Sequence, residues 1–507
     1  MSLLYEGADW DFDKLKRVHE AIGEIAVGEF GLDCYPCQVE VISAEQMLDV
    51  YSSIGLPVLY RHWSFGKRFA RDEALYRKGY QGLAYEIVIN SDPCICYVME
   101  ENSMTMQALV LAHAAFGHNH FFKNNHLFKQ WTDADTILDY LAFARDFVAR
   151  CEECHGVAAV ERILDAAHAL QLQGINRYNR RPRRTLAEEL AREKERRSYE
   201  EGRWDPLWST LPAATKAAAA AKTLAKPEDG RAEPQLPEEN LLYFIEKNAP
   251  NLAGWEREII RIVRMLAQYF YPQRQTKVMN EGCATFVHYR AMTRRHEKGL
   301  IDDGAFLEFL HSHSSVLMQP GFNDRRFGGF NPYALGFAVM QDIERVVTEP
   351  TGEDRAWFGD LAGSGDPMGT LRRVWADFRD ESFILQFLSP KVIRDFRMFS
   401  LRDATGQPEL EVTAIHDDRG YREIRAALAQ EMDCARRDPE ILVAEVDWHG
   451  NRRLELEHRV YDGRRLEVAK LEKTLQLVRE LWGYPVRMRE IDALTGKEMP
   501  YGQTKIA

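Results

Sequence analysis

The chain has 507 residues, more than one hydrophobic core normally holds, so two or three domains are expected. A formal net charge of −12 argues against nucleic-acid binding by the whole chain, and 45% hydrophobic with 28% charged residues is ordinary for a globular protein. No stretch approaches the roughly 20 apolar residues of a membrane span, and the acidic start lacks a signal-peptide pattern. We therefore expect a cytoplasmic protein without a membrane span, whose eight cysteines remain thiols.

The first hundred residues predict helices around a small antiparallel sheet. Helical periodicity covers residues 12–30, a strand follows at 38–42, and Ser43 is a good N-cap for the next helix. The apolar runs 85–90 and 94–99 flank a Ser-Asp-Pro turn and predict two antiparallel strands. The pattern is that of an α+β core.

Residues 104–125 form the most informative stretch of the chain. Almost every position up to Phe116 is apolar, so a helix here is expected to be buried on all sides. His113, His118 and His120 interrupt this apolar helix, and a buried imidazole needs a hydrogen bond, a carboxylate or a metal ion. His113 and His118 are five residues apart, about 140° round an ideal helix. They can share one metal ion only if the helix bulges or ends near Gly117.

The middle of the chain predicts mainly helices. Two amphipathic helices are expected within 133–172, followed at 177–239 by a charged and then Ala/Pro-rich surface excursion. His168 stands alone on an apolar helix face, where a histidine is more often a satisfied core residue than a ligand. Helical patterning returns at 239–248, 252–271, 277–298, 302–313 and 333–347.

The last part of the chain, residues 399–507, predicts a separate domain. Its pattern is strand, helix, two strands, helix and strand, the order of a ferredoxin-like βαββαβ unit. The fold class is therefore α+β, with a large, mainly helical domain at 1–398 followed by a small ferredoxin-like domain at 399–507. A ferredoxin-like fold by itself says little about function.

A second candidate ligand lies far from the histidines in sequence. Glu281 stands in NEGCATF, which resembles the third-ligand helix of gluzincin-type zinc peptidases, and His113, His118 and Glu281 together are candidate zinc ligands. If the fold is zincin-like, His288, two turns after Glu281, is placed to contact substrate or to support a ligand. Tyr333, which enters a helix after an Asn-Pro pair, is a candidate to stabilise an oxyanion.

The likeness to gluzincins departs from their pattern at the general base. Ala114 follows His113 where those enzymes carry the glutamate that takes a proton from water. Glu101, just before the buried helix, is the candidate base, and Glu86 on a predicted strand is an alternative. Glu281 also follows His118 at a much greater distance than in gluzincins.

Several segments together resemble one protein family over nearly the full chain, the SpoVR family, named for stage V sporulation protein R. The segments are WSFGKRF at 63–69, residues 81–125, MNEGCATF at 279–286 and FNPYALGF at 330–337. The resemblance implies a role in spore cortex formation or in stress and stationary-phase responses. It also implies a PrkA-type serine kinase and a YeaH/YhbH-type protein as partners.

Two functions are therefore open. One is a regulatory or scaffolding protein in which the His/Glu residues form a hydrogen-bonded core. The other is a zincin-like metallohydrolase that acts on a peptide or peptidoglycan-type amide.

Overall fold

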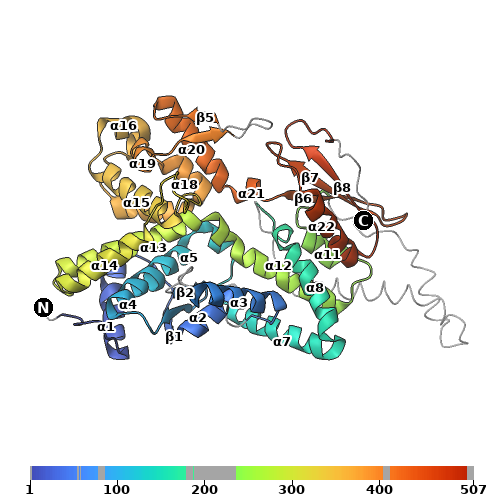
Figure 1. The fold of residues 1–507 in the computed structure, drawn as a ribbon, viewed down its shortest axis with the longest axis horizontal. Helices are drawn as coiled ribbons and strands as arrows, with labels where there is room; N and C mark the ends of the chain where they lie inside the picture. Colours follow the sequence, from blue (N-terminus) through green and yellow to red (C-terminus); the bar gives the residue numbers. More distant parts are fainter. Residues whose placement is uncertain are drawn as a thin grey trace, which may run out of the picture.

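The computed structural model describes residues 3–53, 56, 59–77, 86–177, 187, 236–402 and 411–499. Most of the predicted excursion at 177–239 lies outside these residues. The described chain is mainly helical and carries small sheets at three places (Figure 1). Among its helices, none combines the length and apolar character needed to cross a membrane.

A three-stranded sheet lies between two hydrophobic cores. It consists of β1 (Cys37–Ile42), β2 (Glu86–Ile89) and β3 (Cys94–Met99) in the order β1-β3-β2. β2 is antiparallel to β3, as predicted, but β1 is parallel to β3, so the prediction of a wholly antiparallel sheet was wrong. Side chains on β3 alternate between two hydrophobic cores, because successive residues of a strand point to opposite faces.

The first core contains the apolar side of the predicted histidine helix. The helices that surround it come from residues 12–131 and 277–432, and Figure 1 shows them grouped on the side of the N-terminus. They are α1 (Phe12–Gly23), η1 (Glu24–Glu29), α4 (Met104–Leu111), η2 (Ala112–His118), α5 (Asn119–Asn124), α6 (His126–Trp131), α13 (Lys277–Glu297), α14 (Asp303–Val316), α15 (Pro332–Thr348), α16 (Gly352–Phe358), η5 (Gly359–Leu361), α17 (Pro367–Asp377), α18 (Asp380–Phe387), α19 (Pro390–Asp395) and α20 (Asp418–Met432).

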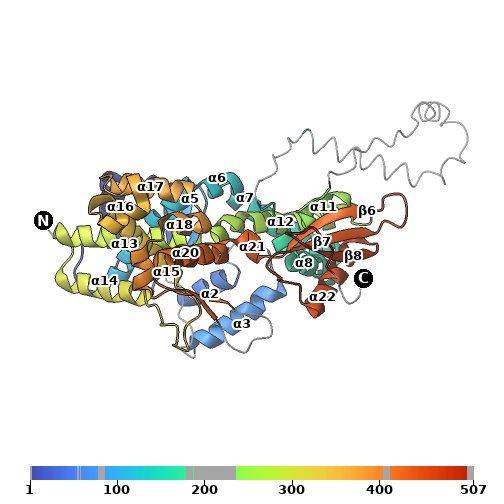
Figure 2. The same ribbon diagram turned by 90° about the horizontal axis from the view of Figure 1, so that it is seen from above.

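The second core joins the middle of the chain to its last elements. Figure 2 shows the C-terminal sheet and α22 beside α8, α11 and α12. The elements here are α2 (Ala44–Ser52), α3 (Trp63–Arg77), α7 (Ile137–His155), α8 (Val157–Ala169), η3 (Gln171–Gln173), α11 (Leu241–Asn248), α12 (Gly254–Gln275), β6 (Glu440–Val446), β7 (Leu454–Val460), α22 (Val468–Trp482) and β8 (Val486–Asp492).

The C-terminal elements form at the predicted places but pair differently from a ferredoxin-like sheet. β5 (Glu411–Ala414) pairs with β4 (Ser400–Arg402), and α21 (Cys434–Arg437) connects α20 to the last sheet, whose order is β6-β7-β8. α20 packs on α18 in the first core and also contacts β4 and β5, so these three elements lie with the large helical part. The ferredoxin-like arrangement is not confirmed, and the domain boundary at residue 398 stays a prediction.

Candidate metal centre

The histidines lie on a helical rod that changes its hydrogen-bonding pattern at the required place. Ser103 caps α4 through its side chain, and the rod continues as η2, a π-helical segment in which all seven residues are buried. The wider π-helical turn bonds residue i to i+5, so His113 and His118 come to share a face. Their ring centroids are 4.6 Å apart. The bulge that the five-residue spacing demanded is present.

Two glycines allow α13 to pack against the rod and against α15 at backbone contact. A Cβ atom on Gly117 would lie 2.5 Å from Cα of Ala284, and one on Gly282 would lie 2.6 Å from Cα of Gly336. No real side chain fits at such separations, so α13 is held between η2 and α15. This close packing carries Glu281, on α13, to the histidines.

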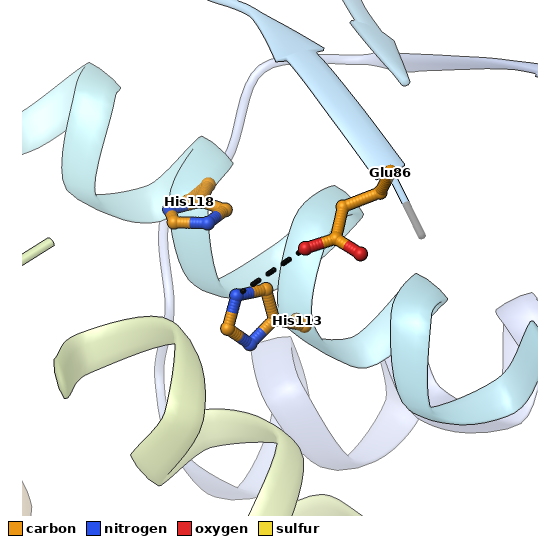
Figure 3. A group of neighbouring side chains, drawn as sticks. All are labelled: Glu86, His113 and His118. Carbon is orange, nitrogen blue, oxygen red and sulfur yellow. Dashed lines mark ion pairs between the residues drawn. The ribbon is translucent and has the colours of Figure 1, made fainter. Parts of the chain in front are cut away.

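Four side chains converge at this point, and we call them the His/Glu cluster: Glu86, His113, His118 and Glu281. Nε2 of His113 lies 3.6 Å from Oε1 of Glu86 and 3.9 Å from Oε2 of Glu281. Nε2 of His118 lies 3.5 Å from the same oxygen of Glu281. One ligand atom each from Glu86, His113 and His118 lie within 4.8 Å of one another (Figure 3).

These separations fit a shared metal ion better than direct hydrogen bonds. A hydrogen bond between these atoms would bring them to about 3 Å. Two ligands of a tetrahedral zinc ion at about 2.1 Å are separated by about 3.4 Å. Nε2 of His113 and Oε2 of Glu281 are buried and have no hydrogen-bond partner in the described structure. Buried polar atoms without partners are costly, and a cation between them would satisfy both.

Polar neighbours fix which ring nitrogen faces the cluster. Nδ1 of His118 lies 2.9 Å from Oδ1 of Asn280, an acceptor, so Nδ1 carries the proton and Nε2 keeps its lone pair. Nδ1 of His113 lies 2.9 Å from Nδ1 of His288, whose Nε2 lies 2.8 Å from Nδ1 of His313. If each imidazole donates to the next, Nε2 of His113 is likewise free to bind a metal ion.

Tyr333, near the start of α15, lies against the His/Glu cluster. Asn331 caps this helix and Pro332 is its first residue, which fixes where the Tyr333 ring enters. The ring stacks on His113 with centroids 6.1 Å apart and planes 18° apart. Burial, followed by the charge of the Glu281 carboxylate, raises the pKa of Tyr333. A phenol kept protonated here is a hydrogen-bond donor.

The burial of the cluster sets its protonation. Burial, and after it the neighbouring His113, lower the pKa of His118 to about 4 against the weaker opposing effects of Glu281 and Asn280, so its imidazole is neutral at neutral pH. Burial raises the pKa of Glu86. Burial alone would also raise the pKa of Glu281, but His113, His118 and Tyr333 favour the carboxylate and lower it overall. Neutral imidazoles and a carboxylate are the forms that bind metal ions.

The other predicted site residues lie in different surroundings. Glu101 is exposed, and its carboxylate accepts a hydrogen bond from the backbone N–H of Ala44, so it holds the start of α2. His120 is buried but turns toward Asp33, whose backbone N–H lies 3.0 Å from its Nδ1. His288 is buried and contacts Nδ1 of His113, the ring nitrogen that does not face the carboxylates. The structure brings together Glu281, His113, His118 and Tyr333.

Sequence reasoning named Glu86 only as an alternative base and did not foresee the roles of Asn280 and His313. Glu86 pairs with Val98 across β2 and β3, so it faces the first core, where η2 lies. The available signal was a glutamate at the start of an otherwise apolar strand. Asn280 adjoins Glu281 in the motif, but its contact depends on how α13 packs against η2.

Comparisons with known proteins agree over nearly the whole chain. The family model described as SpoVR like protein matches residues 9–437, and that described as SpoVR-like C-terminal domain matches residues 439–493. A relative from Escherichia coli (strain K12), named uncharacterized protein YcgB, is 51% identical over 487 residues, covering 96% of this chain and 94% of the relative. No solved structure matches the chain.

Proposed function

The chain belongs to the SpoVR family, and we propose that it is a metal-dependent hydrolase whose metal ion is held by His113, His118 and Glu281. The observation that carries the proposal is that Oε2 of Glu281 lies 3.9 Å from Nε2 of His113 and 3.5 Å from Nε2 of His118, while Oε2 of Glu281 and Nε2 of His113 have no hydrogen bond in the described structure. Two imidazoles and one carboxylate are a ligand set of catalytic zinc sites, which keep a fourth position open.

Zinc suits these ligands better than the alternatives. Magnesium and calcium prefer sites made of oxygen atoms, whereas imidazole nitrogens favour zinc and the later transition metals. A zinc ion in such a site acts as a Lewis acid that polarises a carbonyl group and acidifies water. The substrate class that we propose is an amide of a peptide or of a peptidoglycan-type polymer.

The residues around the ligands have separate roles in this proposal. Glu86 is within 3.6 Å of a ligand nitrogen and is raised in pKa by burial, so it is suited to take a proton from water and return it to the leaving amine. Tyr333 is suited to donate a hydrogen bond to an oxyanion. His288 and Asn280 orient the two ligand imidazoles. Glu86 thus replaces Glu101 as the proposed base.

Hydrolysis by the purified full-length protein tests this proposal. We would incubate it, loaded with zinc, with quenched fluorescent peptides and with peptidoglycan fragments, alongside Glu281→Gln and Tyr333→Phe variants. Cleavage by the native protein, lost in Glu281→Gln and reduced about 10- to 1,000-fold in Tyr333→Phe, is expected. Equal cleavage by the native protein and Glu281→Gln would contradict the proposal.

A regulatory or scaffolding role is the second candidate. It is favoured by Ala114, which stands where gluzincins carry their base, and by the burial of His113 and His118, which are 3% and 7% exposed. In this case the chain takes part in cortex formation or a stress response together with a PrkA-type kinase and a YeaH/YhbH-type protein. Co-purification of such partners equally by the native protein and by Glu281→Gln, without any hydrolysis, would favour this candidate over the first.

A further inference from the structure

A second group of chemically active side chains lies in the other core, at the start of α3. It consists of Ser64, His62 and Asp165, and we call it the Ser/His/Asp group. Ser64 stands within the WSFGKRF segment, to which the metal centre gives no role. Neighbouring Tyr60 and Phe65 belong to the second core, whereas η2 belongs to the first, so the two sites are separate.

The three side chains form one continuous hydrogen-bonded chain. Oγ of Ser64 lies 2.7 Å from Nδ1 of His62, and Nε2 of His62 lies 3.1 Å from Oδ1 of Asp165. The carboxylate only accepts, so Nε2 carries the imidazole proton and Nδ1 is left to accept the serine proton. This is the order of a nucleophile, a general base and an orienting carboxylate.

The surroundings hold the base and the carboxylate in place. The His62 side chain is only 2% exposed, and its ring packs against the rings of Trp63, Phe65 and His168. Oδ1 of Asp165 also accepts a hydrogen bond of 2.8 Å from the Trp63 indole. Burial lowers the pKa of His62, which keeps the imidazole neutral and able to accept a proton.

His168, next to His62, is engaged elsewhere and does not compete for Asp165. Its Nε2 lies 2.6 Å from the hydroxyl of Tyr60. The sequence interpretation of His168 as a satisfied core residue agrees with this contact. The Ser/His/Asp group therefore has one base and one carboxylate.

Ser64 is also approachable from solvent. It is half-buried, and a Cβ atom placed on Gly66, two residues on, would meet nothing within 4 Å. Ser64 lies in the first turn of the 15-residue helix α3, where the helix dipole favours negative charge. Lys67 and Arg68 are exposed beside it, and the carboxylates of Asp165 and Glu161 act on His62 from the other side. The charge around Ser64 is therefore mixed.

We propose that Ser64, His62 and Asp165 form a nucleophilic acyl-transfer site whose substrate is a carboxylic ester. The oxygen of Ser64 bonds to the ester carbonyl carbon while its proton moves to Nδ1 of His62. The bond to the alcohol oxygen then breaks, and the alcohol leaves with that proton. Water repeats the sequence on the acyl-serine, which releases the carboxylic acid and restores Ser64.

A fluorophosphonate probe tests this site on the full-length protein without knowledge of its substrate. The Ser64 oxygen would bond to phosphorus, fluoride would leave, and His62 would take the proton. Labelling of the native protein, located at Ser64 by mass spectrometry, is expected. Asp165→Asn should slow the labelling rate at least 100-fold, and Ser64→Ala should abolish it.

Two controls separate a nucleophile from a serine at a helix start that has no base. Ser103 also stands at the start of a helix, but its hydroxyl bonds to Glu308 rather than to a histidine, so Ser103→Ala should leave labelling unchanged. The circular dichroism spectrum and melting temperature identify variants that fail to fold. No labelling of the folded native protein, labelling that persists in Ser64→Ala, or an unchanged rate in folded Asp165→Asn would overturn the proposal.

Discussion

Individual ring nitrogens decide what the His/Glu cluster can do. Nδ1 of His113 contacts the imidazole of His288, and Nδ1 of His118 contacts the amide oxygen of Asn280. In both histidines Nε2 is therefore the nitrogen that faces the carboxylates. A cluster that existed only to satisfy buried histidines would bring Nε2 within hydrogen-bond distance of an acceptor. The separations of 3.5–3.9 Å instead leave room for a fifth partner.

Replacing Glu86 tests whether this residue is a general base or a metal ligand. Glu86→Gln keeps the shape of the side chain but removes its ability to take a proton, so we expect metal content within twofold of the native value and hydrolysis reduced by about 100-fold or more. Metal analysis and the peptide assay measure both. Glu101→Gln is the matched control and should change neither, because Glu101 binds the backbone of Ala44. Loss of the metal ion in Glu86→Gln would instead make Glu86 a fourth ligand.

Residue types alone led to His113, His118 and Glu281, because imidazoles in an apolar helix and a glutamate in a gluzincin-like motif stand out from their surroundings. The same reasoning chose Glu101 as base on its nearness in sequence to the buried helix. Nearness in sequence does not decide which side chains meet. Glu86 reaches the cluster because its strand places it on the face of Val98, which only the sheet register reveals.

At the scale of elements, the π-helical segment η2 is what makes the site possible. A regular α-helix would turn His118 away from His113, whereas the π-helical register aligns them. The sequence predicted the helix and the need for a bulge. The bulge lies near Gly117, where the five-residue spacing required it, and Gly117 also lets α13 approach the rod, which only the packing reveals.

Adding one methyl group at Gly117 should disturb this packing. The Cβ of Gly117→Ala would lie 2.5 Å from Cα of Ala284, so we expect a loss of about 1–3 kcal/mol in the free energy of unfolding. Chemical denaturation measures it. Gly28→Ala is the matched control, since Gly28 lies in the helical segment η1 with nothing within 4 Å of the added atom, and it should not destabilise the protein. Equal effects of both substitutions would show that the contact does not matter.

At the scale of the whole molecule, the first sheet divides two cores, and each core holds one candidate site. The strands and helices of the last hundred residues follow from their patterns, because alternation and helical periodicity are local signals. Their partners do not follow, since β5 pairs with β4 and α20 packs on α18. Long-range pairing depends on the shape of the remaining core, so the ferredoxin-like expectation had the right elements but not their arrangement.

Buried histidines in both cores should make the protein sensitive to acid. Burial, and after it the neighbouring His62, lower the pKa of His168 to about 4 in the folded protein. In the unfolded chain the same imidazole takes up a proton near pH 6.5. The stabilisation is therefore present above pH 6.5, and it falls by about 1.4 kcal/mol for each pH unit as the pH drops toward 4. His168→Gln should flatten the fall in unfolding free energy between pH 6.5 and 4. The difference between the two proteins isolates this residue, and identical slopes would contradict the account.

The metal content of the purified full-length protein tests the central claim most directly. The protein is dialysed against metal-free buffer, zinc is added, and the excess zinc is removed. Elemental analysis should then find about one zinc ion per chain. His113→Ala and Glu281→Gln should bind at least tenfold less while remaining folded by circular dichroism. The control His126→Ala, which changes an exposed histidine bonded to the backbone of Ala376, should bind as the native protein does. No stoichiometric zinc in the native protein, or equal zinc in folded His113→Ala, would contradict a metal centre at the His/Glu cluster.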